Sequence, residues 1–569
     1  MKSLFIFFLF LNFGLGCFAQ NFQLRIIGSS SSETKTIDSL KYNLKHKNLK
    51  SLTDEITKTS EKLSKIGYIE NKILENIKAD DSSYTSKLRL GKKIKSIHIY
   101  IGRNSELKEL VTTDTKSDTI VIPYEELEVY LNNIIQKLEQ KGFSLAELKL
   151  KNIYNKNTTL FANLSFQTDK QRTLNSIVIQ TSENEKKINF PKGYLKQINR
   201  KYLNKTFNQE ILKQIHDDFE KFGFVKQIKF PEVLFTEDTT KAYIYLEKRK
   251  SNIFDGFIGF SNNENQKIAF NGYLNLTLEN TLRVGEQFSL YWKSDGNKQK
   301  TFKASFELPY LFRSPIGLKT QINIFKQDST FQNTKTEINL SYFINYSTRI
   351  YLGYQSTESS DIKNTNSTKL NDYKNSFVTS NFEYSKNDNN NSTFPKKSTL
   401  SLVTGLGKRN SNSQSEIETI NKQFYVNLEM MHNYYFNTKN SINIRSQNYF
   451  LQSDNYIINE LFRFGGLNSI RGFEENSLQA HFLTSILTEY RYALSPSLYI
   501  HSIIDYGLYK DKTIIIQNNQ KNTLLGLGLG LGLQTKNGLL KLALANGSSK
   551  NQKLNFHNTI VHICYNVKF

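Results

Sequence analysis

The chain has 569 residues, of which 13% are aromatic, and it carries a formal net charge of +23. This length is too great for one soluble core, so we expect two or more domains. The basic excess is spread over both halves of the chain and forms no single basic stripe, which excludes a nucleic-acid-binding function. A solvated surface close to anionic lipid headgroups is the better interpretation.

Residues 1–19 have the layout of a secretory signal peptide. One lysine precedes an apolar run of about ten residues and then small residues, which is too short for a spanning helix. Cys17 and Ala19 are the small residues at −3 and −1, so cleavage is expected before Gln20. Lipidation of Cys17 stays open as an alternative. Elsewhere no apolar run of about 18 residues predicts a spanning helix, and cleavage would leave Cys564 as the only cysteine.

Three internal repeats of about 75 residues follow the leader. Each contains a helical pattern that runs up to a glycine followed by an aromatic residue, at Gly67, Gly142 and Gly223. This glycine suits the left-handed position that ends a helix. The three apolar stripes are Leu52, Ile56, Leu63 and Ile66; Leu127, Leu131, Ile134 and Leu138; and Ile211, Ile215, Phe219 and Phe222.

Short strands flank each predicted helix, so each repeat is an α+β module. The strands expected before the helices are 22–28, 93–102 and 173–181, and those expected after them are 70–77, 146–154 and 241–248. The corresponding domains are residues 20–92, 93–171 and 172–251.

From residue 252 to residue 569 the apolar residues recur with a period of two. Turn-forming clusters such as "SDGNKQK" separate the runs, which is typical of antiparallel strands with one apolar face. In an exported chain this predicts an outer-membrane β-barrel, because only helices and closed barrels satisfy every backbone group in lipid. Roughly 20 residues per strand and turn give about 16 strands. The last strand alternates through Tyr565 and Val567 to an aromatic end at Phe569.

The same alternation predicts which side chains face the lumen near the C-terminus. Glu489 and Asp505 point inward from neighbouring strands, as does Gly507. The run "LLGLGLGLGLQ" turns its leucines to one side and four glycines, Gly526, Gly528, Gly530 and Gly532, to the other. Glycines weaken a strand, so we expect another segment to approach the backbone here. An arginine among glycines, in "GGLNSIRGFEEN", is either an ordinary polar loop tip or a loop aimed at a carboxylate.

In these motifs the chain resembles the BamA/TamA family of outer-membrane assembly proteins. The motifs are "IRGF", "TEYRYALSP", "IIDYG" and "GLGLGLGLQTKNGLLKLALA", in that order before an aromatic terminal strand. The N-terminal repeats resemble the POTRA domains of the same family. The resemblance covers nearly the whole mature chain, and its one mild departure is Cys564, where the family's terminal strand usually has a small residue.

The resemblance implies a fold and a set of site residues. The barrel is of the bacterial surface antigen type, and the loop that carries Ile470, Arg471, Gly472 and Phe473 folds back into its lumen. Arg471 pairs there with Glu489 and Asp505. Client strands are handled at a seam between the first strand, near 254–261, and the last, 557–569.

The resemblance also implies the function. We expect an assembly and insertion factor for outer-membrane proteins, nearer to TamA because three repeats are counted. A two-partner-type secretion translocator is the alternative, and a passive porin is disfavoured because porins lack such repeats. The expected partners are unfolded outer-membrane proteins, a TamB-like periplasmic protein and outer-membrane lipid. The N-terminal domains would lie in the periplasm. No phosphate loop, metal motif or catalytic triad is visible, so neither an enzyme nor a cofactor is predicted.

Overall fold

The computed structural model describes residues 22–102, 118–181, 188–262, 268–295, 299–363, 370–388, 394, 396–412, 418–514, 521–535, 538–550 and 553–568. The predicted leader and Phe569 lie outside these residues. The chain divides into two compact units, residues 1–173 with 206–210 and residues 174–205 with 211–569. Of the helices in the described ranges, none is long and apolar enough to cross a membrane.

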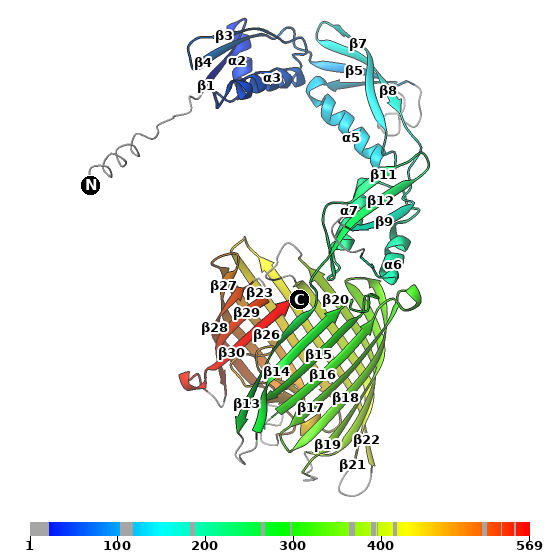
Figure 1. The fold of residues 1–569 in the computed structure, drawn as a ribbon, viewed down its shortest axis with the longest axis vertical. Coiled ribbons are helices and arrows are strands. Elements are labelled where there is room, and N and C mark those ends of the chain that lie inside the picture. The colour runs from blue at the N-terminus through cyan, green and yellow to red at the C-terminus, as the bar shows by residue number, and fades with distance from the viewer. Residues whose placement is uncertain are drawn as a thin grey trace, which may run out of the picture. The chain divides into compact units, whose positions relative to one another are not determined.

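The first module is a four-stranded sheet covered by two helices (Figure 1). Its elements are β1 (Phe22–Gly28), α2 (Ser31–Ser39), β2 (Lys45–His46), α3 (Leu49–Lys65), β3 (Lys72–Lys78) and β4 (Ser83–Arg89). The sheet order is β2-β1-β4-β3, and β1 runs parallel to β4. The Asn48 side chain caps α3 by accepting from the Ser51 amide at 2.8 Å. Leu52, Ile56 and Leu63 are buried on the predicted face of α3.

The second module repeats this topology. Its elements are β5 (Ser96–Tyr100), β6 (Thr119–Pro123), η1 (Tyr124–Glu126), α5 (Leu127–Gln140), β7 (Glu147–Lys156) and β8 (Thr159–Gln167). The sheet order is β6-β5-β8-β7, with β5 parallel to β8. Gly67 and Gly142 follow α3 and α5 with φ of +103° and +95°, the left-handed conformation expected at a helix end.

The third module consists of β9 (Ser176–Thr181), α6 (Lys192–Tyr202), α7 (Gln209–Glu220), β10 (Val225–Gln227), β11 (Glu232–Phe235) and β12 (Thr240–Lys248). β12 pairs in parallel with β9 and in antiparallel with β10 and β11. The left-handed conformation predicted at Gly223 is wrong, because this glycine is absent from the residues with positive φ. A Cβ at Gly223 would lie 2.5 Å from Oε2 of Glu279, so a side chain at this position would displace that carboxylate.

The remaining residues form a closed antiparallel barrel of sixteen strands, which confirms the predicted fold class. The strands are β13 (Ile253–Asn262), β14 (Ile268–Glu279), β15 (Gln287–Asp295), β16 (Gln299–Leu308), β17 (Ile316–Gln327), β18 (Phe331–Asn345), β19 (Thr348–Asp361), β20 (Tyr373–Asn387), β21 (Lys396–Asn412), β22 (Glu418–Tyr435), β23 (Asn440–Gln452), β26 (Phe482–Ala493), β27 (Leu498–Lys510), β28 (Asn522–Gln534), β29 (Gly538–Ser549) and β30 (Ile560–Lys568). In the described parts of the connections lie the single-turn helices η2 (Leu311–Arg313), η3 (Ile458–Glu460) and η5 (Phe556–Asn558).

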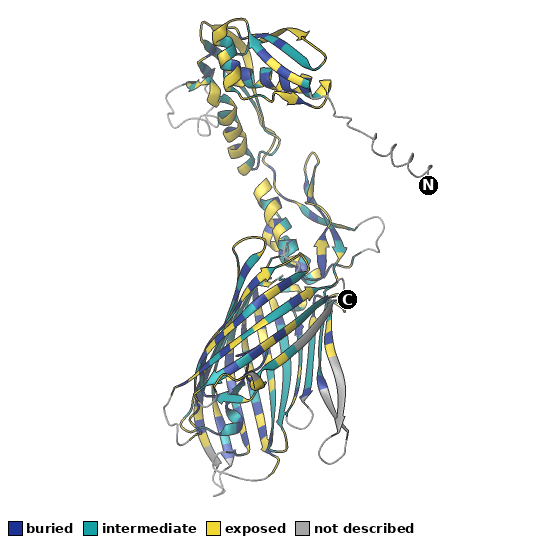
Figure 2. Cartoon of the chain, turned by 90° about the vertical axis from the view of Figure 1, so that its left-hand side faces the viewer, coloured by how far each residue is buried: buried dark blue, intermediate teal, exposed yellow. Residues whose placement is uncertain are grey.

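Side chains alternate between the two faces of the barrel wall, and Figure 2 shows the resulting pattern of buried and exposed residues along the strands. On β27, Ile504 is 52% exposed, Asp505 is fully buried and Tyr506 is 49% exposed. The outward face is therefore apolar and the inward face polar, as lipid outside and water inside require.

The barrel closes over a short ladder. β13 pairs with β14 from Ile253 to Asn262 but with β30 only at Ile253, Phe254 and Asp255. Figure 1 shows β30, in red, beside the green strands at the start of the barrel. This β13–β30 seam thus has the shortest ladder among the strand pairs of the barrel.

Candidate functional site

The connection between β23 and β26, residues 453–481, folds into the barrel and is called the lumenal loop below. It contains a small hairpin of β24 (Phe462–Phe464) and β25 (Leu478–Ala480). Ile470 and Phe473 are buried with Leu483 and Leu487 of β26 and Leu524 of β28. The loop is therefore held against the inner wall by an apolar cluster as well as by polar contacts.

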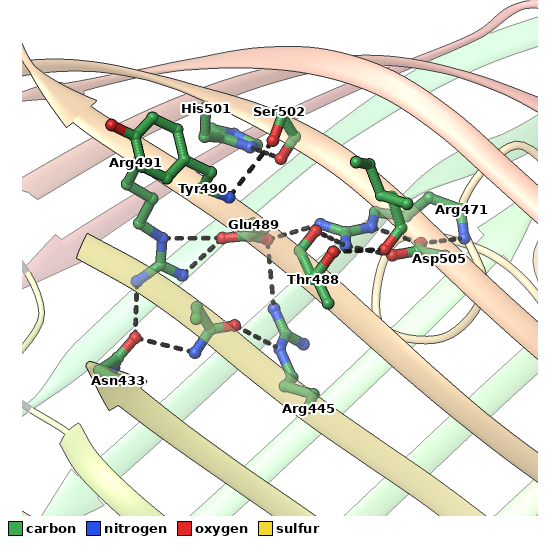
Figure 3. Close-up of polar contacts among 12 residues, drawn as sticks. Asn433, Arg445, Arg471, Thr488, Glu489, Tyr490, Arg491, His501, Ser502 and Asp505 are labelled. Atoms are coloured by element: carbon green, nitrogen blue, oxygen red, sulfur yellow. Dashed lines mark hydrogen bonds and ion pairs between the residues drawn. The ribbon is translucent and has the colours of Figure 1, made fainter. Parts of the chain in front are cut away.

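Arg471 at the tip of the lumenal loop binds two carboxylates (Figure 3). Its Nε and Nη2 donate to the two oxygens of Asp505 at 2.8 and 2.5 Å, and its Nη1 donates to Glu489 Oε1 at 2.5 Å. The backbone amide of Arg471 also donates to Asp505, at 2.9 Å. Burial lowers the pKa of Arg471, but Asp505 and Glu489 outweigh it and raise that pKa overall. Only 3% of Arg471 is exposed, so this is a bidentate, charge-assisted anchor in a sheltered site.

Glu489 is shared among three guanidinium groups. Arg491 donates to its Oε2 from Nε at 2.9 Å and from Nη2 at 2.5 Å, and Arg445 lies 3.7 Å from its Oε1. Asn433 orients Arg491 by accepting from its Nη1 at 2.9 Å. Removal of one charge from such a buried network leaves the others uncompensated, so the network fixes the position of the loop tip firmly.

The lumenal loop approaches the wall most closely at glycines. A Cβ on Gly507 would overlap the side chain of Ile470, and one on Gly526 would overlap the carbonyl oxygen of Arg471. Gly547 on β29, which was not predicted, meets the carbonyl of Gly472 in the same way. Here the lack of a side chain lets two backbones meet.

The other three predicted glycines have different nearest neighbours. A Cβ on Gly528 would meet the Leu544 carbonyl of β29, whereas those on Gly530 and Gly532 would meet the rings of His501 and Tyr499. Another segment therefore approaches the backbone of this glycine run at Gly526, as expected, whereas the nearest atoms at the other three positions belong to neighbouring strands.

A second buried ion pair anchors the other end of the lumenal loop. Arg409 of β21, which is 1% exposed, pairs with Glu460 of η3, and Gln423 of β22 donates to the same carboxylate. Next to it, Asn459 donates to Ser359 Oγ at 2.7 Å. This anchor was not predicted, because nothing in the local sequence relates positions so far apart.

The lumenal loop also reaches the early strands of the barrel. Lys293 of β15 lies 2.7 Å from Glu475 of the loop. Beside this contact is a cavity of about 620 Å³, whose lining includes Asp255 of β13 and Val561 of β30. A second cavity of about 610 Å³ is lined by Lys396 and Arg491, among others, and also by Ile253 of β13. Space thus remains in the lumen around the loop, and both cavities adjoin the seam.

The predicted residues of the terminal strand lie on β30. Tyr565 pairs with Leu540 of β29, and Val567 pairs with Phe254 of β13 and with Gly538 of β29. The predicted aromatic end, Phe569, lies outside the described residues.

The chain belongs to the Omp85 superfamily, whose domain matches residues 264–560. This finding confirms the family that the motifs indicated. Barrels of the superfamily lie in the bacterial outer membrane and insert or transport proteins. No curated protein matches this sequence.

Among solved structures, CdiB from Acinetobacter baumannii is 16% identical with a TM-score of 0.50, over 84% of this chain and 90% of CdiB. BamA from Haemophilus ducreyi, solved without its POTRA domains 1–3, is 14% identical with a TM-score of 0.47, over 82% of this chain and 97% of that one. At these identities the likeness concerns the fold alone.

Proposed function

We propose that this protein assembles other outer-membrane proteins and inserts them at the seam between β13 and β30. The short ladder at this seam, three residue pairs against a full-length ladder between β13 and β14, carries the proposal. An incoming strand that enters lipid with open backbone groups is penalised by several kcal/mol per group. A barrel edge that opens easily offers those groups partners during insertion.

The N-terminal modules complete the proposal as POTRA-like domains in the periplasm. The edge strands of their sheets expose apolar side chains, since Leu74 of β3 is 49% exposed and Tyr154 of β7 is 60% exposed. An unfolded client can add a strand at such an edge and bury its own apolar residues. A TamB-like protein is the periplasmic partner in this proposal, and its gene beside that of this chain would support the assignment. The process needs no cofactor and no catalytic step.

A disulfide across the seam tests the proposal. Phe254 and Val567 are paired in register, so both are replaced by cysteine in a chain with Cys564→Ser. In proteoliposomes, the oxidised protein should lose its ability to fold an added barrel client, measured by heat-modifiable mobility, and reduction should restore it.

A matched control joins Phe254 to Leu276, its partner on β14, across a ladder that need not open. This oxidised variant should keep its activity. If the seam-locked protein still folds clients at the normal rate, insertion at the seam is refuted.

Translocation of a dedicated exported protein through the lumen is the alternative function, and the two cavities beside the lumenal loop favour it. If this alternative is correct, the activity should be blocked by fixing the lumenal loop and not by locking the seam. Ser469 of the loop donates to Gln447 of β23 at 2.7 Å, so cysteines at these positions can be joined by a short bifunctional thiol reagent. A loop fixed in this way should block translocation but leave insertion at the seam unaffected.

A further inference from the structure

Helix α6 carries a row of cationic side chains along one face. Lys192, Lys196 and Arg200 are spaced by four residues and are all exposed. The opposite face, Tyr194, Ile198 and Tyr202, is buried. Among the described residues, no carboxylate lies within ion-pair distance of these three cations. The helix therefore presents a stripe of uncompensated positive charge, called the α6 stripe below.

The same helix lies against two turns of the barrel. Tyr194 donates its hydroxyl to the Gly285 carbonyl at 3.1 Å, in the turn between β14 and β15. Gln197 donates to the Arg313 carbonyl at 2.9 Å, in the turn between β16 and β17. Gln197 lies on the flank of the helix that borders the α6 stripe. The stripe is thus fixed beside the ends of the membrane-spanning strands.

Both turns expose an apolar side chain next to an arginine. In the first turn, Leu282 is 67% exposed and precedes Arg283. In the second, Phe312 is 96% exposed and precedes Arg313. Phe312 has φ of +52° and Arg313 has φ of +59°, conformations that residues other than glycine adopt only when their surroundings impose them.

The position of the second turn relative to the bilayer follows from the strands that it joins. Ile316 of β17 is 45% exposed and pairs in register with Tyr342 of β18, which is 53% exposed. Aromatic residues that point outward, such as Tyr342, mark the border between acyl chains and headgroups. Phe312 lies four residues beyond Ile316, at the level of the headgroups.

We propose that the α6 stripe and the two turns form a binding surface for anionic phospholipid headgroups. Phe312 and Leu282 contact the acyl-chain border, while Arg283, Arg313 and the stripe bind lipid phosphates. The surface lies in the leaflet on the side of the third module. It requires only that the barrel spans a bilayer and does not depend on the protein that is handled.

Spin-labelled lipids test this proposal in the full-length protein. The protein is reconstituted into phosphatidylcholine vesicles containing phosphatidylglycerol, and the motionally restricted fraction of each spin-labelled lipid is measured. We expect about a threefold preference for phosphatidylglycerol at low ionic strength, reduced in 0.5 M salt because salt screens exposed charges. Lys192→Gln, Lys196→Gln and Arg200→Gln together should remove most of it, and Arg283→Gln with Arg313→Gln should remove part.

A control variant removes the same charge elsewhere. Lys47, Lys50 and Lys58 of the first module are exposed, and their replacement by glutamine should leave the preference unchanged. An equal loss in this control would assign the effect to net charge and overturn the proposal. If the stripe variant, verified as folded by heat-modifiable mobility, keeps the threefold preference, the stripe faces water or an acidic protein and the proposal is also overturned.

Discussion

The wall formed by β26 to β29 and the seam between β13 and β30 hold their strands in different ways. The wall has long ladders, and the lumenal loop is fastened to its inner side through Arg471, Ile470 and the close contact at Gly526. The seam has three residue pairs at one end of its strands. Both lie in one barrel and face the same lipid, so the difference lies in the length of the backbone ladders and in the side chains that brace the wall.

This contrast indicates how one barrel can be stable and still open. Backbone pairing in a closed barrel is uniform by default, because each unpaired group in lipid is costly. A local weakness is tolerated when the rest of the wall is held by contacts that do not depend on the seam. The buried carboxylates of the wall, Glu489 and Asp505, supply such contacts.

Arg471→Ala should have the largest effect on this arrangement. It leaves the buried Asp505 without its guanidinium partner and removes one of the three that bind Glu489, a change that typically costs about 3–5 kcal/mol. The free energy of unfolding can be measured by urea titration in detergent micelles, with Trp292, the only tryptophan, as the fluorescent probe. Arg471→Lys keeps the charge but not the bidentate geometry, so its free energy of unfolding should lie between those of the unchanged protein and Arg471→Ala. Unchanged stability of Arg471→Ala would show that the loop does not brace the wall.

The second anchor separates the effect of charge from that of packing. Arg409→Met alone should destabilise the barrel by about 3 kcal/mol, because the buried Glu460 then keeps the hydrogen bond from Gln423 but loses its cationic partner. Arg409→Met combined with Glu460→Leu should recover most of this loss, since a buried pair can often be replaced by apolar residues. The same urea titration measures both variants. Equal loss in the single and double variants would indicate that packing, not charge compensation, dominates.

The barrel and the direction of its side chains could be predicted from the sequence, because a period of two is a local property. Asp505 between Ile504 and Tyr506 is an example, and the burial of these residues agrees. The strand β8 was not predicted although Leu160, Ala162 and Leu164 alternate in it. The strand β4 carries no comparable apolar alternation.

The site could be predicted only in part. The motif around Arg471 pointed to Glu489 and Asp505 through the family resemblance, whereas composition and spacing alone left an ordinary loop tip open. The pairing of Arg409 with Glu460 and the close approach at Gly547 depend on how the loop crosses the lumen. These contacts join separate strands, and no local pattern encodes them.

Alanine substitutions in the glycine-rich strand should separate loop contacts from strand contacts. In Gly526→Ala the new methyl group meets the Arg471 carbonyl, so the loop must move, at about 1–3 kcal/mol. In Gly530→Ala it meets first the ring of His501, a side chain that can turn away, and the cost should be smaller. The loop position is measured by how readily a disulfide forms between cysteines that replace Gln447 of β23 and Ser469 of the loop. If both variants leave it unchanged, the loop does not depend on close approach at Gly526.

The smallest effect is expected at the seam itself. Phe254 is 43% exposed and sits on the three-pair ladder, so Phe254→Ala should change the free energy of unfolding by less than about 1 kcal/mol. Ile503 on β27 is 1% exposed and packs with Ala543 and Ala545, so Ile503→Ala, which removes fewer atoms, should cost about 2–5 kcal/mol. Urea titration of the two variants compares a truncation in the wall with one at the seam. A larger loss for Phe254→Ala would mean that the seam contributes to stability as the wall does, and a barrel of that kind would not open there for a client strand.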